Sequence, residues 1–423
     1  MSKKTKKLVP KLRFPEFRDT KTWDIPKLAS LGTFTGGGTP SRDRADYWVG
    51  KNAWVSSSDI SEDGIIDISI TRFISDEAIQ DSATKIVPEN SILLVSRVGV
   101  GKLAISNKPI CTSQDFTNFT PVKDNLVFLA YSLKNQKNKL LKFNQGMAIK
   151  GFTKDDISNL EIPLPTCNEQ QKIADCLSSI DDLISTQNQK VEALKTHKKG
   201  LMQQLFPREG EAVPRLRFPE FWNAGEWEIK PFSSFVKLYR GSSPRPIQEF
   251  LTKSSDGVNW IKIGDTKFAS NFVLHKVEER ITKSGAEKSR YVEIGELILA
   301  NSMSYGKTYQ LAISGCIYDG WFVLREYDEF FHKPFLLHLL NSDFMQKQYE
   351  SLSAGGIVQN ISSEIVYNSI LQRTLIAEQQ KIANCLSSID DLINVQTQKL
   401  EALKSHKKGL MQQLFPSTEA DSE

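Results

Sequence analysis

The sequence contains no long apolar run of the kind that crosses a membrane. Its apolar stretches, such as Ser91 to Val95 and Phe335 to Leu340, are far shorter than the ~20 residues that span a bilayer. The basic start, Met1 to Lys7, is not followed by an apolar segment, which disfavours a secretory signal. We therefore expect a cytoplasmic protein.

Metal-binding and disulfide patterns are also missing. The five cysteines are scattered and form no CxxC pair, and the five histidines have no metal-ligand spacing. The cysteines are Cys111, Cys167, Cys176, Cys316 and Cys385. We expect neither a zinc site nor a disulfide framework.

The familiar catalytic motifs are absent as well. Gly306-Lys307-Thr308 resembles the end of a phosphate-binding loop, but Asn301 stands where that loop requires its first glycine. The sequence contains neither a dinucleotide fingerprint nor the Asn/Asp-Pro-Pro-Tyr/Phe segment of amino-methyltransferases. We therefore expect no catalytic residue, no metal and no cofactor in this chain.

The composition is that of a soluble globular protein. Of 423 residues, 39% are hydrophobic and 25% are charged, and the length suggests two or three domains. The net charge of +4 is only a weak indication of an anionic partner, although a small total can hide local basic surfaces.

Two internal repeats organise the chain. Residues 169–207 and 378–416 are identical at 33 of 39 positions, at a constant offset of 209. A shorter repeat starts each half, where Val9 to Phe17 reads VPKLRFPEF and Val213 to Phe221 reads VPRLRFPEF. The order is therefore globular half, long repeat, globular half, long repeat.

The long repeat predicts a coiled-coil helix. Its apolar residues recur in alternating steps of four and three, and Gln187, Lys198 and their counterparts in the second copy fill the remaining seam positions. Gly200 and Gly409 lie inside the pattern, either at a close contact or merely tolerated. The predicted seam residues are Ile173, Leu177, Ile180, Ile184, Val191, Leu194, Leu201 and Leu205 in the first copy, and Ile382, Leu386, Ile389, Ile393, Leu400, Leu403, Leu410 and Leu414 in the second.

Boundary residues mark the ends of both helices. Thr166 and Glu169 indicate a capping box at the start of the first helix, whereas Leu375 stands at the equivalent place before the second. Pro207 and Pro416 indicate where each helix ends.

Connectivity predicts how the helices pair. The first helix leaves the first half and reaches the second, so the second helix must run back to bury its seam. We expect an antiparallel pair, of about 35 residues and roughly 50 Å, with one globular domain at each end. The predicted segments are a domain over 1–165, a helix over 166–212, a domain over 213–376, and a helix with an acidic tail over 377–423. The alternative is that each helix pairs with another protein.

Each globular half is predicted to be a mixed α/β domain. Ile92 to Val95, Leu297 to Ala300 and Trp260 to Ile263 have the length and apolarity of strands, and we expect helices over Leu126 to Phe143 and Lys333 to Tyr349. The fold class is therefore α/β, in an α+β arrangement, with a pseudo-twofold internal repeat. The two halves diverge where the helices do not, which indicates related but different tasks, such as reading two different short sequences.

Loops rich in Gly, Ser, Asn, Gln, Arg and Lys recur in both halves. These residue types contact phosphates and base edges in DNA complexes, although each such loop could equally be ordinary surface. The candidate contacts of the first half are Gly37, Thr39, Ser41, Arg42, Ser57, Ser58, Arg97, Lys102, Gln145 and Lys150. Those of the second half are Arg240, Ser242, Ser243, Arg245, Lys262, Asn301, Ser302, Lys307, Gln359 and Asn360.

These features together resemble the specificity subunit of type I restriction-modification enzymes. The helices open on Glu-Gln-Gln-Lys-Ile, at Glu169 to Ile173 and Glu378 to Ile382, and the halves start with Leu-Arg-Phe-Pro-Glu-Phe, at Leu12 to Phe17 and Leu216 to Phe221. The resemblance covers essentially the whole chain. One departure is Leu371 to Thr374, which replaces the Pro-Leu-Pro-Thr lead-in of the first copy.

The resemblance implies that each domain is a target-recognition domain reading one half of a bipartite, asymmetric site in double-stranded DNA. The helices would dock two methyltransferase subunits, which use S-adenosylmethionine to methylate adenine N6. Motor-nuclease subunits that use ATP and Mg would add translocation and cleavage. Independently, two domains held tens of ångström apart fit major-groove segments one turn, ~34 Å, apart.

Two other classes of function stay open at this point. One is a coiled-coil scaffold whose globular domains bind proteins, and the other is an enzyme with an unfamiliar site. Salt-dependent DNA affinity would exclude the scaffold, because phosphate contacts release counterions. Methylation or cleavage by the purified chain alone would indicate an enzyme. The sequence does not reveal the target bases or whether a nuclease partner exists.

Overall fold

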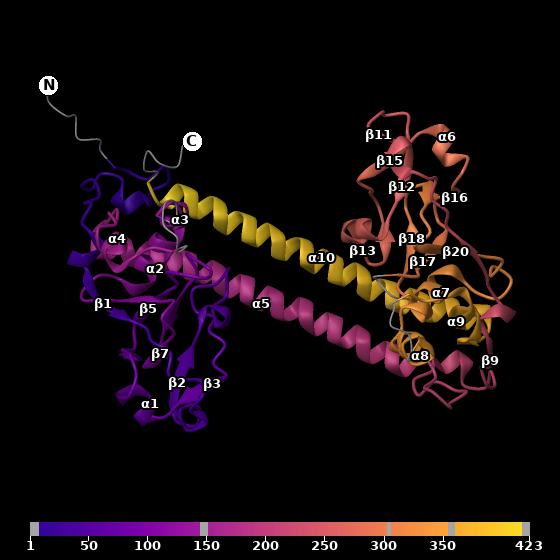
Figure 1. The fold of residues 1–423 in the computed structure, drawn as a ribbon, viewed down its shortest axis with the longest axis horizontal. Coiled ribbons are helices and arrows are strands. Elements are labelled where there is room, and N and C mark those ends of the chain that lie inside the picture. Colours follow the sequence, from indigo (N-terminus) through magenta and orange to yellow (C-terminus); the bar gives the residue numbers. More distant parts are fainter. Residues whose placement is uncertain (1–7, 144–150, 303–305, 354–359, 417–423) are drawn as a thin grey trace. The chain divides into compact units, whose positions relative to one another are not determined.

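A computed structural model describes residues 8–143, 151–302, 306–353 and 360–416, and Figure 1 shows their fold. The chain divides into two compact units. Unit 1 comprises residues 1–187 and 399–423, and unit 2 comprises residues 188–398. Each unit therefore combines one globular domain with a part of each long helix.

Two four-stranded sheets form the domain of unit 1. The first sheet has the strand order β1-β8-β5-β6, and the second has the order β3-β2-β7-β4, in which β2 and β7 are parallel. The strands are β1 Gly32–Gly36, β2 Asn52–Val55, β3 Arg72–Ile74, β4 Ile86–Val87, β5 Ser91–Leu94, β6 Leu103–Ser106, β7 Ile110–Thr112 and β8 Thr117–Pro121.

The same strand order recurs in unit 2. The run β10-β20-β17-β18 matches the first sheet and is extended by β14 and β13, and β15-β12-β19-β16 matches the second sheet and is extended by β11. A separate ribbon pairs β9 with β21. The strands are β9 Glu228–Pro231, β10 Lys237–Arg240, β11 Leu251–Thr252, β12 Val258–Ile261, β13 Ala269–Ser270, β14 Val273–Leu274, β15 Glu279–Ile281, β16 Arg290–Val292, β17 Leu297–Ala300, β18 Thr308–Leu311, β19 Gly315–Ile317, β20 Trp321–Arg325 and β21 Ile370–Arg373.

Strand register identifies equivalent buried positions in the two domains. Trp54 of β2 opposes Cys111 of β7, and Trp260 of β12 opposes Cys316 of β19, in parallel pairs. All four side chains are buried, and burial raises the pKa of both thiols to about 11. The two divergent halves of the sequence therefore share one topology and one set of core positions.

Short helices complete both domains. They are α1 Asp76–Gln80, α2 Leu126–Asn135, α3 Lys137–Lys142 and α4 Lys154–Ser158 in unit 1, and α6 Lys283–Ala286, α7 Lys333–Leu340, α8 Asp343–Ser353 and α9 Ser363–Asn368 in unit 2. The single helices predicted over 126–143 and 333–349 are wrong in one respect, because each is broken in two. At the second break, the side chain of Asn341 donates to the carbonyl oxygens of Thr308 and Leu337, in competition with the helical backbone.

The long repeats form α5 Cys167–Leu205 and α10 Ile376–Leu414, each of 39 residues. In unit 1, Lys407 of α10 pairs with Asp181 of α5, and in unit 2, Lys198 of α5 pairs with Asp390 of α10. Within unit 1, Ile173 and Leu177, which precede Asp181 in α5, share a core with Leu414, which follows Lys407 in α10, so these two segments are antiparallel. Among the described residues, no helix combines the length and apolarity of a membrane span.

Burial follows the seam pattern along both helices. Every predicted seam residue is buried or half-buried. Leu177 in the seam is fully enclosed, whereas Leu183, outside the seam, is 56% exposed. A Cβ added at Gly200 or Gly409 would meet no atom within 4 Å, so these glycines are tolerated in the helices and serve no close contact.

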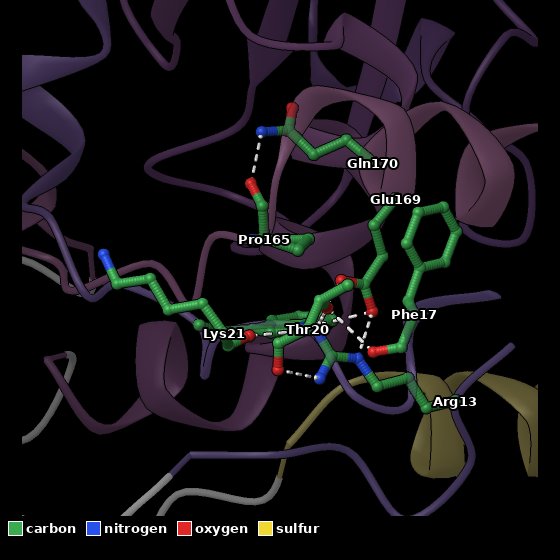
Figure 2. Close-up of polar contacts among 8 residues, drawn as sticks. Arg13, Phe17, Thr20, Lys21, Pro165, Glu169 and Gln170 are labelled. Carbon is green, nitrogen blue, oxygen red and sulfur yellow. Dashed lines mark hydrogen bonds and ion pairs between the residues drawn. The ribbon is translucent and has the colours of Figure 1, made fainter. Parts of the chain in front are cut away.

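A buried ion pair joins the start of each domain to the start of its helix. In unit 1, Nε and Nη2 of Arg13 each donate to the Glu169 carboxylate at 2.7 Å, as Figure 2 shows. In unit 2, Arg217 and Glu378 repeat this two-pronged contact at 2.8 Å. Because parallel hydrogen bonds to a carboxylate match the guanidinium geometry, they offset part of the cost of removing both charges from water.

Neighbouring side chains complete each junction. Gln170 accepts from the backbone nitrogen of Asn125 at 2.9 Å and donates to the Pro165 carbonyl at 3.0 Å (Figure 2). Gln379 likewise accepts from the backbone nitrogen of His332 at 2.8 Å. We use "junction" for Arg13, Glu169 and Gln170 in unit 1 and for Arg217, Glu378 and Gln379 in unit 2.

In the junction of unit 1, the Glu169 side chain has partners other than those of the predicted capping box. The sequence assigns the Glu169 side chain to the backbone of Thr166, but its two carboxylate oxygens accept from Arg13 and, at 3.3 Å, from the indole of Trp23. Trp23 in turn packs edge-on against Phe415, which follows α10, with ring centroids 6.4 Å apart. The short repeat, the helix start and the other helix's end therefore meet in one core.

Candidate nucleic-acid interface

The loops after β1 and after β10, which occupy the same place in the two sheets, pack closely against protein backbone. A Cβ on Gly37 would collide with the carbonyl oxygen of Ser113, and a Cβ on Gly241 would collide with that of Tyr318. Gly37 is one of the predicted DNA contacts. In the structure its missing side chain lets the loop settle on the turn that precedes β8.

Four of the predicted contact residues in unit 2 converge on Asp319. The Ser243 hydroxyl donates to its carboxylate at 2.7 Å, and Arg245 lies 3.5 Å from the other carboxylate oxygen. The Asn301 amide and the Arg240 guanidinium donate to its backbone carbonyl at 2.9 Å and 3.3 Å. The Ser243 hydrogen bond is the largest cause of the lowered pKa of Asp319, and the charges of Arg245 and Arg240 make smaller contributions in the same direction.

Asp115 occupies the same loop in unit 1. Its carbonyl oxygen accepts from the backbone nitrogens of Ser96 at 2.7 Å and Arg97 at 3.2 Å. Its carboxylate accepts from the Ser113 hydroxyl at 3.3 Å. In each domain, one aspartate therefore connects loops that carry candidate contact residues.

The predicted contact residues divide by exposure. Those exposed to solvent are Ser41, Arg42, Ser58, Arg97, Arg240, Ser242, Arg245 and Asn360. Those half-buried are Gly37, Thr39, Lys102, Ser243, Lys262, Ser302 and Lys307. Ser57 and Asn301 are buried, and Gln145, Lys150 and Gln359 lie outside the described residues. The exposed set can reach a bound polyanion directly, whereas Asn301 holds the Asp319 loop from beneath.

Burial weakens two cations as phosphate contacts. Lys307 is half-buried, and desolvation lowers the pKa of its ammonium. Lys102 lies 3.8 Å from the Glu62 carboxylate, with 21% of its side chain exposed. Arg42 and Arg97, at exposed loop positions, have the better access to a DNA backbone.

A second polar group lies at the ends of β2 and β12, and of its members only Lys262 was predicted from the sequence. In unit 1, Arg72 of β3 donates to the hydroxyl of Ser56 at 2.8 Å and to the carboxylate of Asp59. In unit 2, the ammonium of Lys262 lies 2.5 Å from the carboxylate of Glu279 of β15. Both segments have a Trp followed five residues later by an Asp, Trp54 with Asp59 and Trp260 with Asp265, and strand register confirms that these positions correspond.

A buried histidine in unit 2 belongs to the core. His338 is 6% exposed, and burial, with a smaller contribution from Lys198, lowers its pKa to about 3. Its Nε2 lies 3.4 Å from the Ser387 hydroxyl of α10. Within the part of the chain that the structure describes, no three His, Cys, Asp or Glu side chains group as metal ligands.

Comparison with known proteins finds relatives of this chain and a family model that matches its first half. Residues 20–196 match the type I restriction modification DNA specificity domain. The type I restriction enzyme MjaIX specificity subunit of Methanocaldococcus jannaschii is 31% identical over 247 residues, which cover 54% of this chain and 56% of that relative. The MjaVIII specificity subunit of the same organism is 28% identical over 348 residues, which cover 78% of this chain and 79% of that relative.

A solved structure shares the fold. The S subunit of a type I restriction-modification system from M. genitalium superposes with a TM-score of 0.57 at 15% identity, covering 97% of this chain and 100% of that chain. The resemblance carried by the two internal repeats is thus confirmed by sequence and by fold. The chain is similar to the specificity subunits of type I restriction enzymes, and residues 20–196 match their DNA specificity domain.

Proposed function

We propose that this chain is the DNA-recognition subunit of a type I restriction-modification complex and has no catalytic site of its own. One observation carries the proposal: the two domains share a strand order and register while their exposed polar side chains differ. A shared framework with different surface chemistry suits two readers of different short sequences. Each domain would read one half of a bipartite, asymmetric target.

The near-identity of the two long helices suggests two copies of the same partner subunit. Two methyltransferase subunits would dock on α5 and α10, whose sequences are nearly the same, and would bring S-adenosylmethionine for adenine N6 methylation. Motor-nuclease subunits would bring ATP and Mg. Exposed arginines such as Arg42, Arg97 and Arg245 would supply the phosphate contacts, which give affinity without sequence preference.

Genome-wide mapping of adenine methylation tests the proposal. Cells that express this chain with its methyltransferase partner are compared with cells lacking the gene for this chain. We expect a gapped, asymmetric motif that disappears with the gene. A methylome unchanged by the deletion, together with DNA affinity that does not fall with salt, would favour the protein-binding scaffold instead.

A further inference from the structure

The turns that follow β2 and β12 have the same backbone hydrogen bonding in both domains, and we call this shared turn the framework. The backbone nitrogen of Ser56 donates to the carboxylate of Asp59 at 2.7 Å, and that of Lys262 donates to the carboxylate of Asp265 at 2.8 Å. The strands that precede them contain buried Trp54 and Trp260 in matching register. Position 56 therefore corresponds to position 262, and aspartate caps the following turn in both domains.

The side chains on this framework differ in the sign of their charge. Trp54 opposes Arg72 across the β2–β3 pair, whereas Trp260 opposes Glu279 across the β12–β15 pair. The same strand position thus holds a cation in unit 1 and an anion in unit 2. The second position is also exchanged, because the neutral Ser56 of unit 1 is replaced by Lys262 in unit 2.

A cation beside the capping aspartate is not needed for the turn to form. In unit 2, the carboxylate of Asp265 is fully buried and accepts from the backbone nitrogens of Lys262, at 2.8 Å, and Glu278, at 3.0 Å. The ammonium of Lys262 points to Glu279 instead. The turn therefore forms without a cation on its aspartate, so Arg72 in unit 1 is not explained by the turn alone.

Exposure and packing suit these side chains to contact a ligand. The side chains of Arg72, Lys262 and Glu279 are 36%, 33% and 39% exposed. The Arg72 guanidinium lies over the Trp54 ring, 4.7 Å from its centroid, so its plane is held before any ligand arrives. A preorganised guanidinium loses little freedom when it binds a flat acceptor pair.

We propose that positions 56 and 72 in the first domain, and 262 and 279 in the second, read bases of the DNA target. Arg72 would donate to the O6 and N7 atoms of a guanine, the commonest specific contact in the major groove. Glu279 would accept from the amino group of a cytosine, while Lys262 donates to the neighbouring acceptor edge. This inference rests on the proposed function. It attributes a difference between the two half-sites to the different residues at positions 56 and 262 and at positions 72 and 279.

The test compares methylation motifs of the complex containing the wild-type chain, Arg72→Gln and Glu279→Gln. We expect Arg72→Gln to relax one base pair of one half-site, and Glu279→Gln to relax one base pair of the other. In competition binding with duplexes altered at that base pair, discrimination should fall about 10- to 100-fold. Arg44→Gln is the control: its exposed pair with Asp46 lies on the same domain, and the motif should stay unchanged.

Two further outcomes keep the test decisive. If a wild-type motif is found and both variants keep it with unchanged discrimination, the base-reading assignment is wrong while the proposed function stands. If Arg72→Gln fails to fold, Arg72→Lys keeps a cation beside Asp59 but loses the planar fork, and it should still change the half-site. A folded variant that loses affinity equally for all duplexes would make Arg72 a phosphate contact and overturn the proposal.

Discussion

The buried arginine at the start of each domain explains why the short sequence repeat occurs in both halves. Arg13 and Glu169 have side chains 6% and 1% exposed, and the pair recurs as Arg217 with Glu378. Lys172 and Glu16, which belong to the same two repeats, form a second pair at 3.3 Å that stays about half exposed. The residues shared by the repeats therefore attach the start of the domain to the start of its helix, through one buried and one solvent-exposed ion pair.

Replacing Arg13 by glutamine should destabilise unit 1 strongly. The substitution leaves the Glu169 carboxylate buried without a charged partner, which costs about 3–5 kcal/mol in buried pairs. Urea unfolding followed by tryptophan fluorescence measures the loss, because Trp23 lies at the junction. Lys172→Gln is the matched control and should cost less than about 1 kcal/mol, since its pair is exposed. Equal effects of the two substitutions would contradict the role given to burial.

At the scale of elements, periodicity is read most directly from the long helices. The 4-3 pattern extends over many turns, and seam residues such as Ile173, Leu177 and Ile382 are buried as that pattern requires. Short strands offer too few residues for such a pattern. The sequence places a strand over 260–263, but β12 ends at Ile261 and a turn capped by Asp265 follows. A side-chain hydrogen bond across a turn leaves no periodic trace in a sequence.

A charge placed in the seam should separate the helix segments. Leu194 is half-buried in the seam, whereas its neighbour Ala193 is exposed. Leu194→Asp removes apolar contacts and brings a carboxylate against them, so we expect a loss of about 2 kcal/mol or more in the free energy of unfolding. Ala193→Asp should change little. Circular dichroism during thermal unfolding measures both, and equal melting temperatures would show that residue 194 lies outside the helix contact.

At the scale of the whole molecule, the helices belong to neither domain alone. Each unit takes a segment of α5 and a segment of α10, so the domain boundaries drawn from repeats and the compact units in space divide the chain differently. Linear repeats predict the order of the parts well. They do not show that β1 to β8 and the corresponding strands of unit 2 share one topology, because equivalent strands such as β5 and β17 have different sequences.

Exchanging residues 214–376 for the same region of a similar specificity subunit should change one half of the methylated motif. The exchanged block contains Arg217 but not its partner Glu378, so the incoming domain must supply an arginine at that place. Sequencing of methylated adenines before and after the exchange provides the measurement. A change in both half-sites would show that the domains do not read independently.

Each unit contains a segment of both long helices, and this division has a consequence for biosynthesis. In unit 1, the backbone nitrogen of Leu12 donates to the carbonyl oxygen of Gln413 at 3.0 Å, and Phe415 lies in the same core as Trp23. Unit 2 needs nothing beyond residue 398. On the ribosome, the domain translated first is therefore the last to be completed. A chain released after residue 398 and before residue 410 would carry a complete second domain and a first domain still open to proteases and chaperones.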